Sequence, residues 1–322
     1  MNRQRTVLVT GASGFVGAAL VERLASEEYF RVLALVRREG VLLPPLAVPV
    51  RASADYLDGE LLFPEGVDVL VHCAARVHVM SDVSNDPLTE YRKVNVEGTL
   101  KLAEQAARAG IHRFIFISSI KVNGEGTRLG APYTADDIAA PCDPYGVSKM
   151  EAEQQLRLLG ERTGMEVVII RPVLVYGPGV KANFRSMMDW LNKGVFLPLG
   201  AIRNQRSLVA LDNLVDLIVT CVDHPSAPNQ TFLVSDGDDM STTDLLMRMG
   251  IALGKPARLI PVPVLLLQLA AAMIGRKAIG QRLCGSLQVD IGKTRRMLGW
   301  TPPSTVASAL RKTAESFQRS LK

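Results

Sequence analysis

Short apolar runs alternate with amphipathic segments through the first half of the chain. The amphipathic segments, at 16–24, 88–109 and 145–159, place apolar residues at helical spacing. The apolar runs are rich in Val, Ile and Phe and are predicted as strands: 6–10, 32–36, 67–72, 113–118 and 166–171. Strands that alternate with helices in this way form right-handed βαβ units. The pattern therefore predicts an α/β fold with a doubly wound parallel sheet.

The alternation becomes less regular after Pro172, where turns become more frequent. We expect residues 1–172 to form the doubly wound (Rossmann) domain. Residues 173–322 are expected to form mainly a smaller C-terminal α/β domain that binds the substrate. Ligands of such folds bind in the cleft outside the carboxyl ends of the strands.

Composition excludes several classes of protein but leaves the partner open. The chain of 322 residues has 48% hydrophobic and 21% charged residues, unlike a disordered, collagen-like or coiled-coil protein. Its mean hydropathy of +0.16 is expected for strands buried on both faces. The net charge of +5 is uneven, because residues 276–322 carry ten Lys and Arg side chains against Asp290 and Glu315. This basic tail suits a nucleic acid, an anionic membrane or an anionic small molecule.

The remaining composition signals concern compartment, metals and membranes. The four cysteines are scattered, which indicates reduced thiols in the cytoplasm, and the four histidines form no metal-binding motif. The first strand begins at residue 6, so no signal peptide is expected. The most apolar segment, 259–275, contains Pro261 and Pro263 and is too short to be a transmembrane segment. Residues 264–274 are predicted to form a packed helix, with contact to a membrane surface as the alternative.

Three glycines follow the first predicted strand and open the first predicted helix. Gly11 permits a tight turn, Gly14 lets the backbone approach a pyrophosphate, and Gly17 lets the helix pack closely on the strand. The amide groups and the positive end of the helix favour a bound anion. This GxxGxxG turn predicts dinucleotide binding. The candidate cofactor contacts in the turn are Gly11, Ser13, Gly14, Phe15, Val16 and Gly17.

The end of the second strand bears on the choice of dinucleotide. A carboxylate about 20 positions beyond the third glycine binds the ribose 2′-hydroxyl of NAD, whereas this chain has Arg37 and Arg38 there. A guanidinium pairs with a 2′-phosphate that a carboxylate would repel. We therefore expect NADP(H) in preference to NAD(H). Asp55 and Tyr56, further along the chain, are candidate contacts to the adenine.

Two groups suited to proton transfer lie one helical turn apart in the segment 145–159. Tyr145 and Lys149 are four residues apart and share a helix face. A phenol titrates near ~10, and a neighbouring cation favours the phenolate. Ser119, after the strand at 113–118, is placed to hydrogen-bond the reacting oxygen. These three residues are the predicted catalytic groups for hydride and proton exchange at a carbinol or carbonyl.

These motifs, in this order, resemble those of the extended short-chain dehydrogenases/reductases, in the NAD-dependent epimerase/dehydratase family. The resemblance covers nearly the whole chain. Besides the glycine turn and the three catalytic groups, it rests on the segments 72–75, 95–99, 171–179 and 298–302.

The family resemblance implies further roles for this chain. Lys149 would also bind the nicotinamide ribose, and a segment around 206–235 would return to the cofactor domain. The helices predicted at 88–109 and 145–159 would form a four-helix bundle in a homodimer. The cofactor contacts that the resemblance adds are Cys73, Ala74, Ala75, Asn95, Tyr145, Lys149, Pro172 and Val175.

Departures from the family pattern bear on the reaction. Family dehydratases have a Thr followed by Asp-Glu where this chain has Ile120 and Lys121, so dehydration is not expected. An epimerase and a reductase both remain, because each can use the three catalytic groups. The segments 74–80 and 118–124 are most similar to bacterial 4-ketoreductases of UDP-N-acetylquinovosamine synthesis, and Arg37 and Arg38 favour a reductase that consumes NADPH.

The leading hypothesis is therefore an NADPH-dependent 4-ketoreductase of a UDP-4-keto-6-deoxy-N-acetylhexosamine in surface polysaccharide (lipopolysaccharide O-antigen) biosynthesis. A UDP-hexose or UDP-N-acetylhexosamine 4-epimerase with bound NAD is the first alternative, and a non-catalytic NAD(P)-sensing protein the second. Binding of a nucleotide-diphosphate sugar would account for part of the positive charge of the basic tail. The sequence contains no nucleic-acid-binding motif. The candidate substrate contacts are Arg76, His78, Ser119, Lys121, Asn123, Asn183, Arg206 and Arg282.

Overall fold

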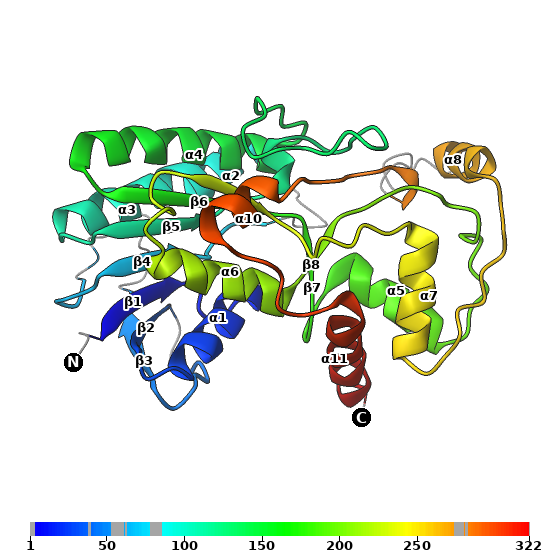
Figure 1. Ribbon diagram of the computed structural model, residues 1–322, viewed down its shortest axis with the longest axis horizontal. Coiled ribbons are helices and arrows are strands. Elements are labelled where there is room, and N and C mark those ends of the chain that lie inside the picture. Colours follow the sequence, from blue (N-terminus) through cyan, green and yellow to red (C-terminus); the bar gives the residue numbers. More distant parts are fainter. Residues whose placement is uncertain are drawn as a thin grey trace.

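A seven-stranded parallel sheet forms the centre of the larger part of the molecule (Figure 1). The computed structural model describes residues 4–37, 40–52, 61, 63–77, 86–273, 280 and 283–321. The strands, in spatial order, are β3 (Ala47–Arg51), β2 (Phe30–Val36), β1 (Arg5–Thr10), β4 (Val69–His72), β5 (Arg113–Ile117), β6 (Glu166–Pro172) and β9 (Thr231–Val234). All neighbouring strands run parallel. The predicted doubly wound parallel sheet is confirmed.

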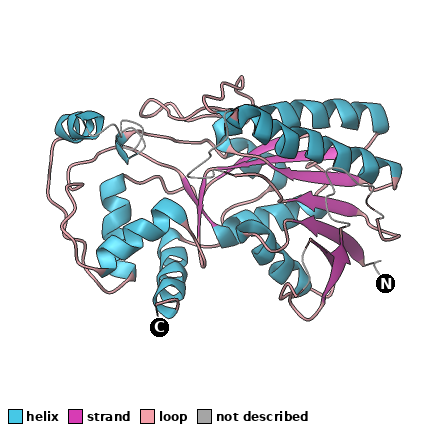
Figure 2. Cartoon of the chain, turned by 180° about the vertical axis from the view of Figure 1, so that it is seen from behind, coloured by secondary structure: helices cyan, strands magenta, loops and turns pink. Residues whose placement is uncertain are grey.

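Helices cover both faces of this sheet (Figure 2). Successive residues of a strand point to opposite faces. Val7 and Val9 of β1 pack with α1 (Phe15–Ala25) and α6 (Leu211–Asp223). Leu8, between them, packs with α3 (Thr99–Arg108) and α4 (Pro144–Thr163) on the other face. Because both faces are covered, the strands are almost wholly apolar.

The segment predicted as one helix at 88–109 is divided into three elements. It consists of α2 (Pro87–Arg92), the π-helical turn η1 (Lys93–Gly98) and α3. The side chain of Asn95, in η1, is buried and bonds to the main chain of Arg76 after β4. A π-helical turn is typical of functional sites. Here it directs Asn95 toward the carboxyl ends of the strands.

The smaller part of the molecule surrounds a second core. It contains a short parallel sheet of β7 (Leu174–Tyr176) and β8 (Leu208–Ala210) and the helices α5 (Ala182–Asn192), α7 (Thr242–Ala252) and α11 (Val306–Arg319). The helix α8 (Val264–Met273) lies at its far edge, and α10 (Gly292–Leu298) packs near β9 (Figure 1). The chain crosses between the two parts, since α6 and β9 belong to the larger part although they follow residue 172. Of the helices that the structure describes, not one is both long and apolar enough to cross a membrane.

Candidate active site

The glycine turn forms a tight cradle between β1 and α1. Gly11 has φ +65°, and a Cβ at this position would lie 2.7 Å from the amide nitrogen of Ala74. A Cβ on Gly17 would overlap the carbonyl oxygen of Gly11, to which the Gly14 amide donates at 2.8 Å. The cradle therefore exists only with glycine at these positions.

The start of α1 is suited to an anion. Gly14 precedes the helix without a side-chain cap, and the first turn contains no acidic residue. Ser13 and Gly14 are exposed there, whereas Phe15 and Val16 are half-buried. Backbone amides at an uncapped helix start attract phosphate. The cradle and the helix start together fit the pyrophosphate of a dinucleotide.

Alanine in place of Gly11 should abolish cofactor binding. Gly110 provides a matched control, because it also has positive φ, +76°, but no heavy atom would lie within 4 Å of an added Cβ. Both substitutions incur the left-handed backbone penalty of about 1–2 kcal/mol. Only Gly11→Ala adds the clash with Ala74, so its urea midpoint should fall further, and only it should lose bound nicotinamide cofactor. Equal retention of cofactor by both variants would contradict the cradle.

The ends of β1 and β4 are joined beside this cradle. His72 is buried, with Nδ1 2.7 Å from Thr10 Oγ1 and Nε2 3.1 Å from Thr99 Oγ1. Burial and the charge of Lys149 lower the pKa of His72 to about 3, so its imidazole is neutral. The segment Cys73–Ala75 follows directly, and burial raises the pKa of the Cys73 thiol to about 12. Sequence patterns gave no sign of this threonine–histidine–threonine link.

Ser119, Tyr145 and Lys149 meet at the carboxyl end of β5. Tyr145 is the second residue of α4, and its phenol forms a side-chain hydrogen bond with Ser119. Burial and the carboxylate of Asp143 raise the pKa of Tyr145, whereas the bond with Ser119 lowers it. The arrangement brings a phenol, a hydroxyl and an amine to one place, which can exchange a proton with a carbinol.

Lys149 is enclosed by protein. Its side chain is 1% exposed, and its Nζ lies 3.8 Å from the centre of the Phe116 ring. Burial lowers the pKa of Lys149 to about 7, while Glu153 opposes the shift. The ammonium is therefore close to losing its proton at neutral pH in the protein without ligand.

Cofactor-free protein should become more stable to unfolding as the pH rises from about 7. The pKa of Lys149 is 10.5 in its ordinary environment and about 7 in the folded protein. Between these values the unfolded chain binds a proton that the folded chain lacks, so the free energy of unfolding rises with pH. Lys149→Met removes this contribution, and Lys193→Met serves as a surface control. Urea titrations at pH 6.5 and 9 measure the difference; identical pH slopes for wild type and Lys149→Met would contradict it.

Asn95 links the loop after β4 to α4. Its Nδ2 donates to the Arg76 carbonyl at 3.0 Å and to Ser148 Oγ at 3.1 Å, and its Oδ1 accepts from the Arg76 amide at 2.8 Å. Ser148 in turn donates to the carbonyl of Tyr145. The position of Tyr145 therefore depends on the π-helical turn.

A buried ionic network lies behind these groups. Glu153, on α4, forms a bidentate ion pair with Arg171 of β6, at 2.9 and 2.6 Å. Ser118 donates to Glu153 at 2.5 Å, and Arg171 donates to the Asn123 side chain at 2.9 Å. Of these residues, sequence reasoning had identified only Asn123, as a substrate contact. Its amide also donates to the Thr134 carbonyl and it is 1% exposed, so the structure places it in the core instead.

The other predicted residues lie on several separate elements of the structure. Lys121 forms ion pairs with Asp143 and Glu125, so its charge is already paired within the protein. Asn183 is exposed in the first turn of α5, and Arg206 is half-buried and donates to the Gly285 carbonyl at 3.0 Å. Pro172 is buried, Val175 half-buried, and Arg37 exposed at the end of β2. The predicted contacts that lie outside the described residues are Arg38, Asp55, Tyr56, His78 and Arg282.

Known proteins with related sequences and folds were identified by comparison. The model of the NAD dependent epimerase/dehydratase family matches residues 7–235. A UDP-glucose 4-epimerase from Vibrio cholerae is 50% identical over 319 residues, which cover 97% of this chain and 95% of the relative.

Two solved structures have the same fold at low sequence identity. One is a UDP-glucose 4-epimerase from Thermotoga maritima with UDP-glucose, with a TM-score of 0.77, 21% identity and coverage of 98% of this chain and 100% of that chain. The other is a UDP-glucuronic acid 4-epimerase from Bacillus cereus in complex with NAD, with a TM-score of 0.77, 19% identity and the same coverage.

Proposed function

The chain belongs to the NAD-dependent epimerase/dehydratase family, and we propose that it is a 4-epimerase of UDP-hexoses or UDP-N-acetylhexosamines that keeps NAD bound. The family resemblance predicted from the motifs is confirmed. The observation that carries the proposal is the 50% identity to a UDP-glucose 4-epimerase along nearly the whole chain. The hydrogen-bonded Ser119 and Tyr145, with Lys149 one turn away, supply the chemistry that such a reaction needs.

The prediction of a 4-ketoreductase is wrong. The similarity to the Vibrio cholerae epimerase overturns it, and the structure explains why the local pattern misled. The ketoreductase hypothesis relied on the segments 74–80 and 118–124 and on Arg37 and Arg38. The second segment contains Lys121 and Asn123. Both side chains are engaged by other parts of the protein, Lys121 by two carboxylates and Asn123 by Arg171 and Thr134. Their identity therefore reports local packing rather than the sugar.

Tyr145 is the acid and base of the proposed reaction. A nicotinamide cofactor held by the glycine cradle would supply a reversible hydride acceptor for C4 of the sugar. As a phenolate, Tyr145 takes the proton of the C4 hydroxyl, and it returns a proton to the same oxygen when C4 is reduced from the opposite face. The hydrogen bond from Ser119 favours the phenolate and opposes burial and Asp143, which raise the pKa of Tyr145. The reaction has no net oxidation.

We assign the binding roles from the motifs and the family resemblance. The glycine cradle, the Cys73–Ala75 loop and Asn95 are assigned to the dinucleotide, together with Pro172 and Val175. Asn183, at the start of α5, and Arg206, before β8, are assigned to the diphosphate of the substrate. The homodimer that the family resemblance implies stays a prediction, as does a role in surface polysaccharide synthesis.

We assign NAD rather than NADP as the resident cofactor. A reaction without net oxidation does not draw on the reducing pool, which was one reason to expect NADP. The other reason to expect NADP was a guanidinium at the end of β2. In the described residues that guanidinium is Arg37, whose side chain is exposed. Mass spectrometry of the cofactor released by denaturing the purified protein should identify NAD, whereas release of NADP would restore the original preference.

Purified protein should convert UDP-glucose to UDP-galactose without added cofactor. Proton NMR of the anomeric signals measures the product, and the absorbance at 340 nm should stay constant because no reduced cofactor is consumed. UDP-N-acetylglucosamine tests the acetamido sugars in the same way. Absence of any C4 epimer from either substrate, with cofactor shown to be bound, would refute the proposed function.

A further inference from the structure

The helix α8 exposes an apolar face at the edge of the molecule. It lies at the far end of the smaller part, away from the seven-stranded sheet (Figures 1 and 2). Leu265, Leu266, Leu269 and Met273 are 67%, 54%, 52% and 83% exposed. At 100° per residue these positions lie within one third of the helix circumference. Val264 and Leu267, on the opposite side, pack against the core of the smaller part.

This apolar face is not explained by the fold. The helix contains one polar residue, Gln268, and no charged one. A surface helix of a globular protein normally turns polar residues to water, and a cluster of exposed large apolar residues marks an interaction site. Neither the glycine cradle nor the group around Tyr145 involves α8. The exposed face therefore needs a partner of its own.

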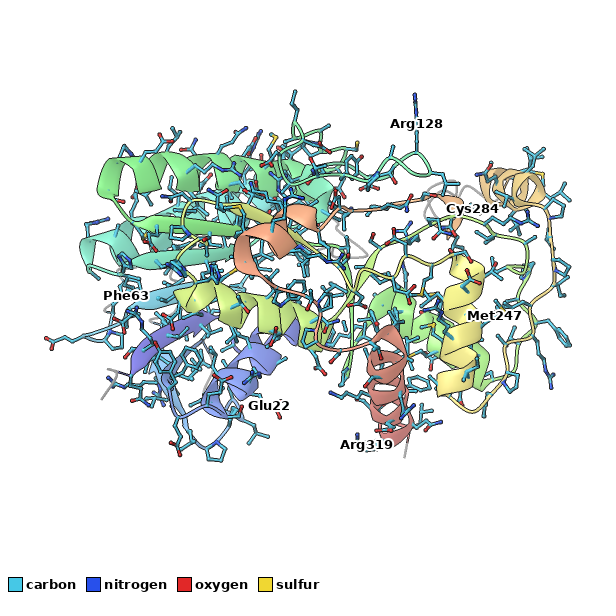
Figure 3. The ribbon with its side chains drawn as sticks, in the orientation of Figure 1. Glu22, Phe63, Arg128, Met247, Cys284 and Arg319 are labelled. Atoms are coloured by element: carbon cyan, nitrogen blue, oxygen red, sulfur yellow. The ribbon has the colours of Figure 1, made fainter. Side chains whose placement is uncertain are left out.

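The charge around α8 identifies the chemistry of that partner. In the sequence, the 45 residues from 245 to 289 contain no Asp or Glu but six Lys and Arg: Arg248, Lys255, Arg258, Arg276, Lys277 and Arg282. Of these, Arg248 is paired with Asp238, and Arg276, Lys277 and Arg282 lie outside the described residues. Arg128, on the segment between β5 and α4, points outward from the top of the molecule (Figure 3). Apolar residues flanked by cations suit a surface with acyl chains beneath anionic headgroups.

A second copy of the chain fits this surface less well. A two-fold interface would place the same segment on both sides. The segment 245–289, which has an excess of positive charge in the sequence, would then meet its own copy, and like charges in an interface are unfavourable. A nucleic acid would pair with the cations but leave the leucines unmatched.

We propose that α8 is a peripheral docking element that rests its apolar face on an anionic lipid bilayer. The leucines enter the boundary between headgroups and acyl chains, and the cations of the segment 245–289 supply the attraction to the headgroups. The helix lies along the surface rather than across the bilayer. The catalytic groups need not move, because α8 is packed on the side of the smaller part away from the seven-stranded sheet.

Co-sedimentation of the full-length protein with vesicles tests this proposal. The protein should pellet with vesicles of phosphatidylglycerol and phosphatidylethanolamine but not with vesicles of phosphatidylcholine alone. Added NaCl should weaken the binding, because salt screens the attraction between cations and headgroups. The affinity of the variant Leu265→Gln/Leu269→Gln for these vesicles should fall at least about tenfold, since the variant lacks two membrane-facing apolar side chains.

Two controls keep the vesicle experiment decisive. Leu42→Gln removes a leucine that is 98% exposed elsewhere on the surface and should bind vesicles like wild type. Circular dichroism and turnover of UDP-glucose should be unchanged in the double variant, because both positions are exposed and lie outside the proposed active site.

Three outcomes would overturn membrane docking. The first is that the wild-type protein does not pellet with anionic vesicles, and the second is that the double variant pellets as well as wild type. The third is that wild type does not bind vesicles but the double variant has a lower oligomeric mass than wild type. The last would show that α8 instead contacts a second copy.

Discussion

Replacing Tyr145 with Phe should remove the acid–base group while leaving the cofactor in place. The substitution removes only the hydroxyl group of Tyr145, and the ring keeps its edge-on contact with the Tyr91 ring at 5.9 Å between centroids. General acid–base catalysis contributes about 10²–10⁴-fold to enzymatic rates. We therefore expect turnover of UDP-glucose to fall by about that factor, with the amount of bound nicotinamide cofactor and the unfolding midpoint nearly unchanged.

Tyr91→Phe is the matched control for this experiment. Tyr91 is 4% exposed and lies beside Tyr145, so the substitution removes a phenol from the same neighbourhood. Its turnover should stay within a few-fold of wild type. If Tyr145→Phe retains wild-type turnover, another group transfers the proton. If it loses cofactor as well as turnover, Tyr145 acts in binding, and the assignment of the acid and base fails.

The parts of the site that depend on local spacing could be predicted from the sequence. The glycine turn is set by three positions within seven residues, and Tyr145 and Lys149 share a face of α4 because they are four residues apart. The alternation of apolar runs with amphipathic segments likewise fixed the type of sheet, which the structure confirms.

Contacts between distant residues could not be predicted in this way. The segment 88–109 has a continuous helical pattern, but Asn95 bonds to the main chain of Arg76 and the helix widens into a π turn there. Lys121 was predicted to bind the substrate, but in the structure it pairs with Asp143, which lies 22 residues further along the chain. Periodicity in the sequence describes one helix or strand at a time. The contacts of these side chains instead depend on residues that the fold brings close from distant parts of the chain.

The choice of reaction failed for a related reason. Epimerases and reductases of this family share the catalytic groups, so the sequence near those groups does not separate them. The residues that favoured a reductase were identified by similarity of short segments, without knowledge of what each side chain contacts. Similarity along the whole chain carried the information that the short segments lacked.

Removing the carboxylate of Glu153 should destabilise the protein strongly. Glu153 is 1% exposed and Arg171 4% exposed, and each carboxylate oxygen accepts a hydrogen bond from that guanidinium. In Glu153→Ala the guanidinium stays buried without its counter-ion, and breaking a buried pair in this way costs about 3–5 kcal/mol. The free energy of unfolding, from urea titrations of the protein, should fall by that amount.

Glu151→Ala provides the control on the same helix. Glu151 pairs with Arg92 at 2.6 Å, but the side chains are 24% and 45% exposed. An exposed pair of this kind is worth about 0–1 kcal/mol. Comparable losses for the two alanine variants would show that burial does not determine the strength of the Glu153 pair.

A double substitution separates the pair itself from the cost of an unpaired charge. Glu153→Met/Arg171→Met removes both charges together and fills similar volume with apolar atoms. Because the guanidinium of Arg171 is no longer left buried without its carboxylate, the double variant should be more stable than Glu153→Ala although it lacks one more native group. If the double variant is instead as unstable as Glu153→Ala, the loss comes from the missing ion pair itself and not from an unpaired buried charge. The network would then hold α4, and with it Tyr145, by its own attraction rather than by the penalty for breaking it.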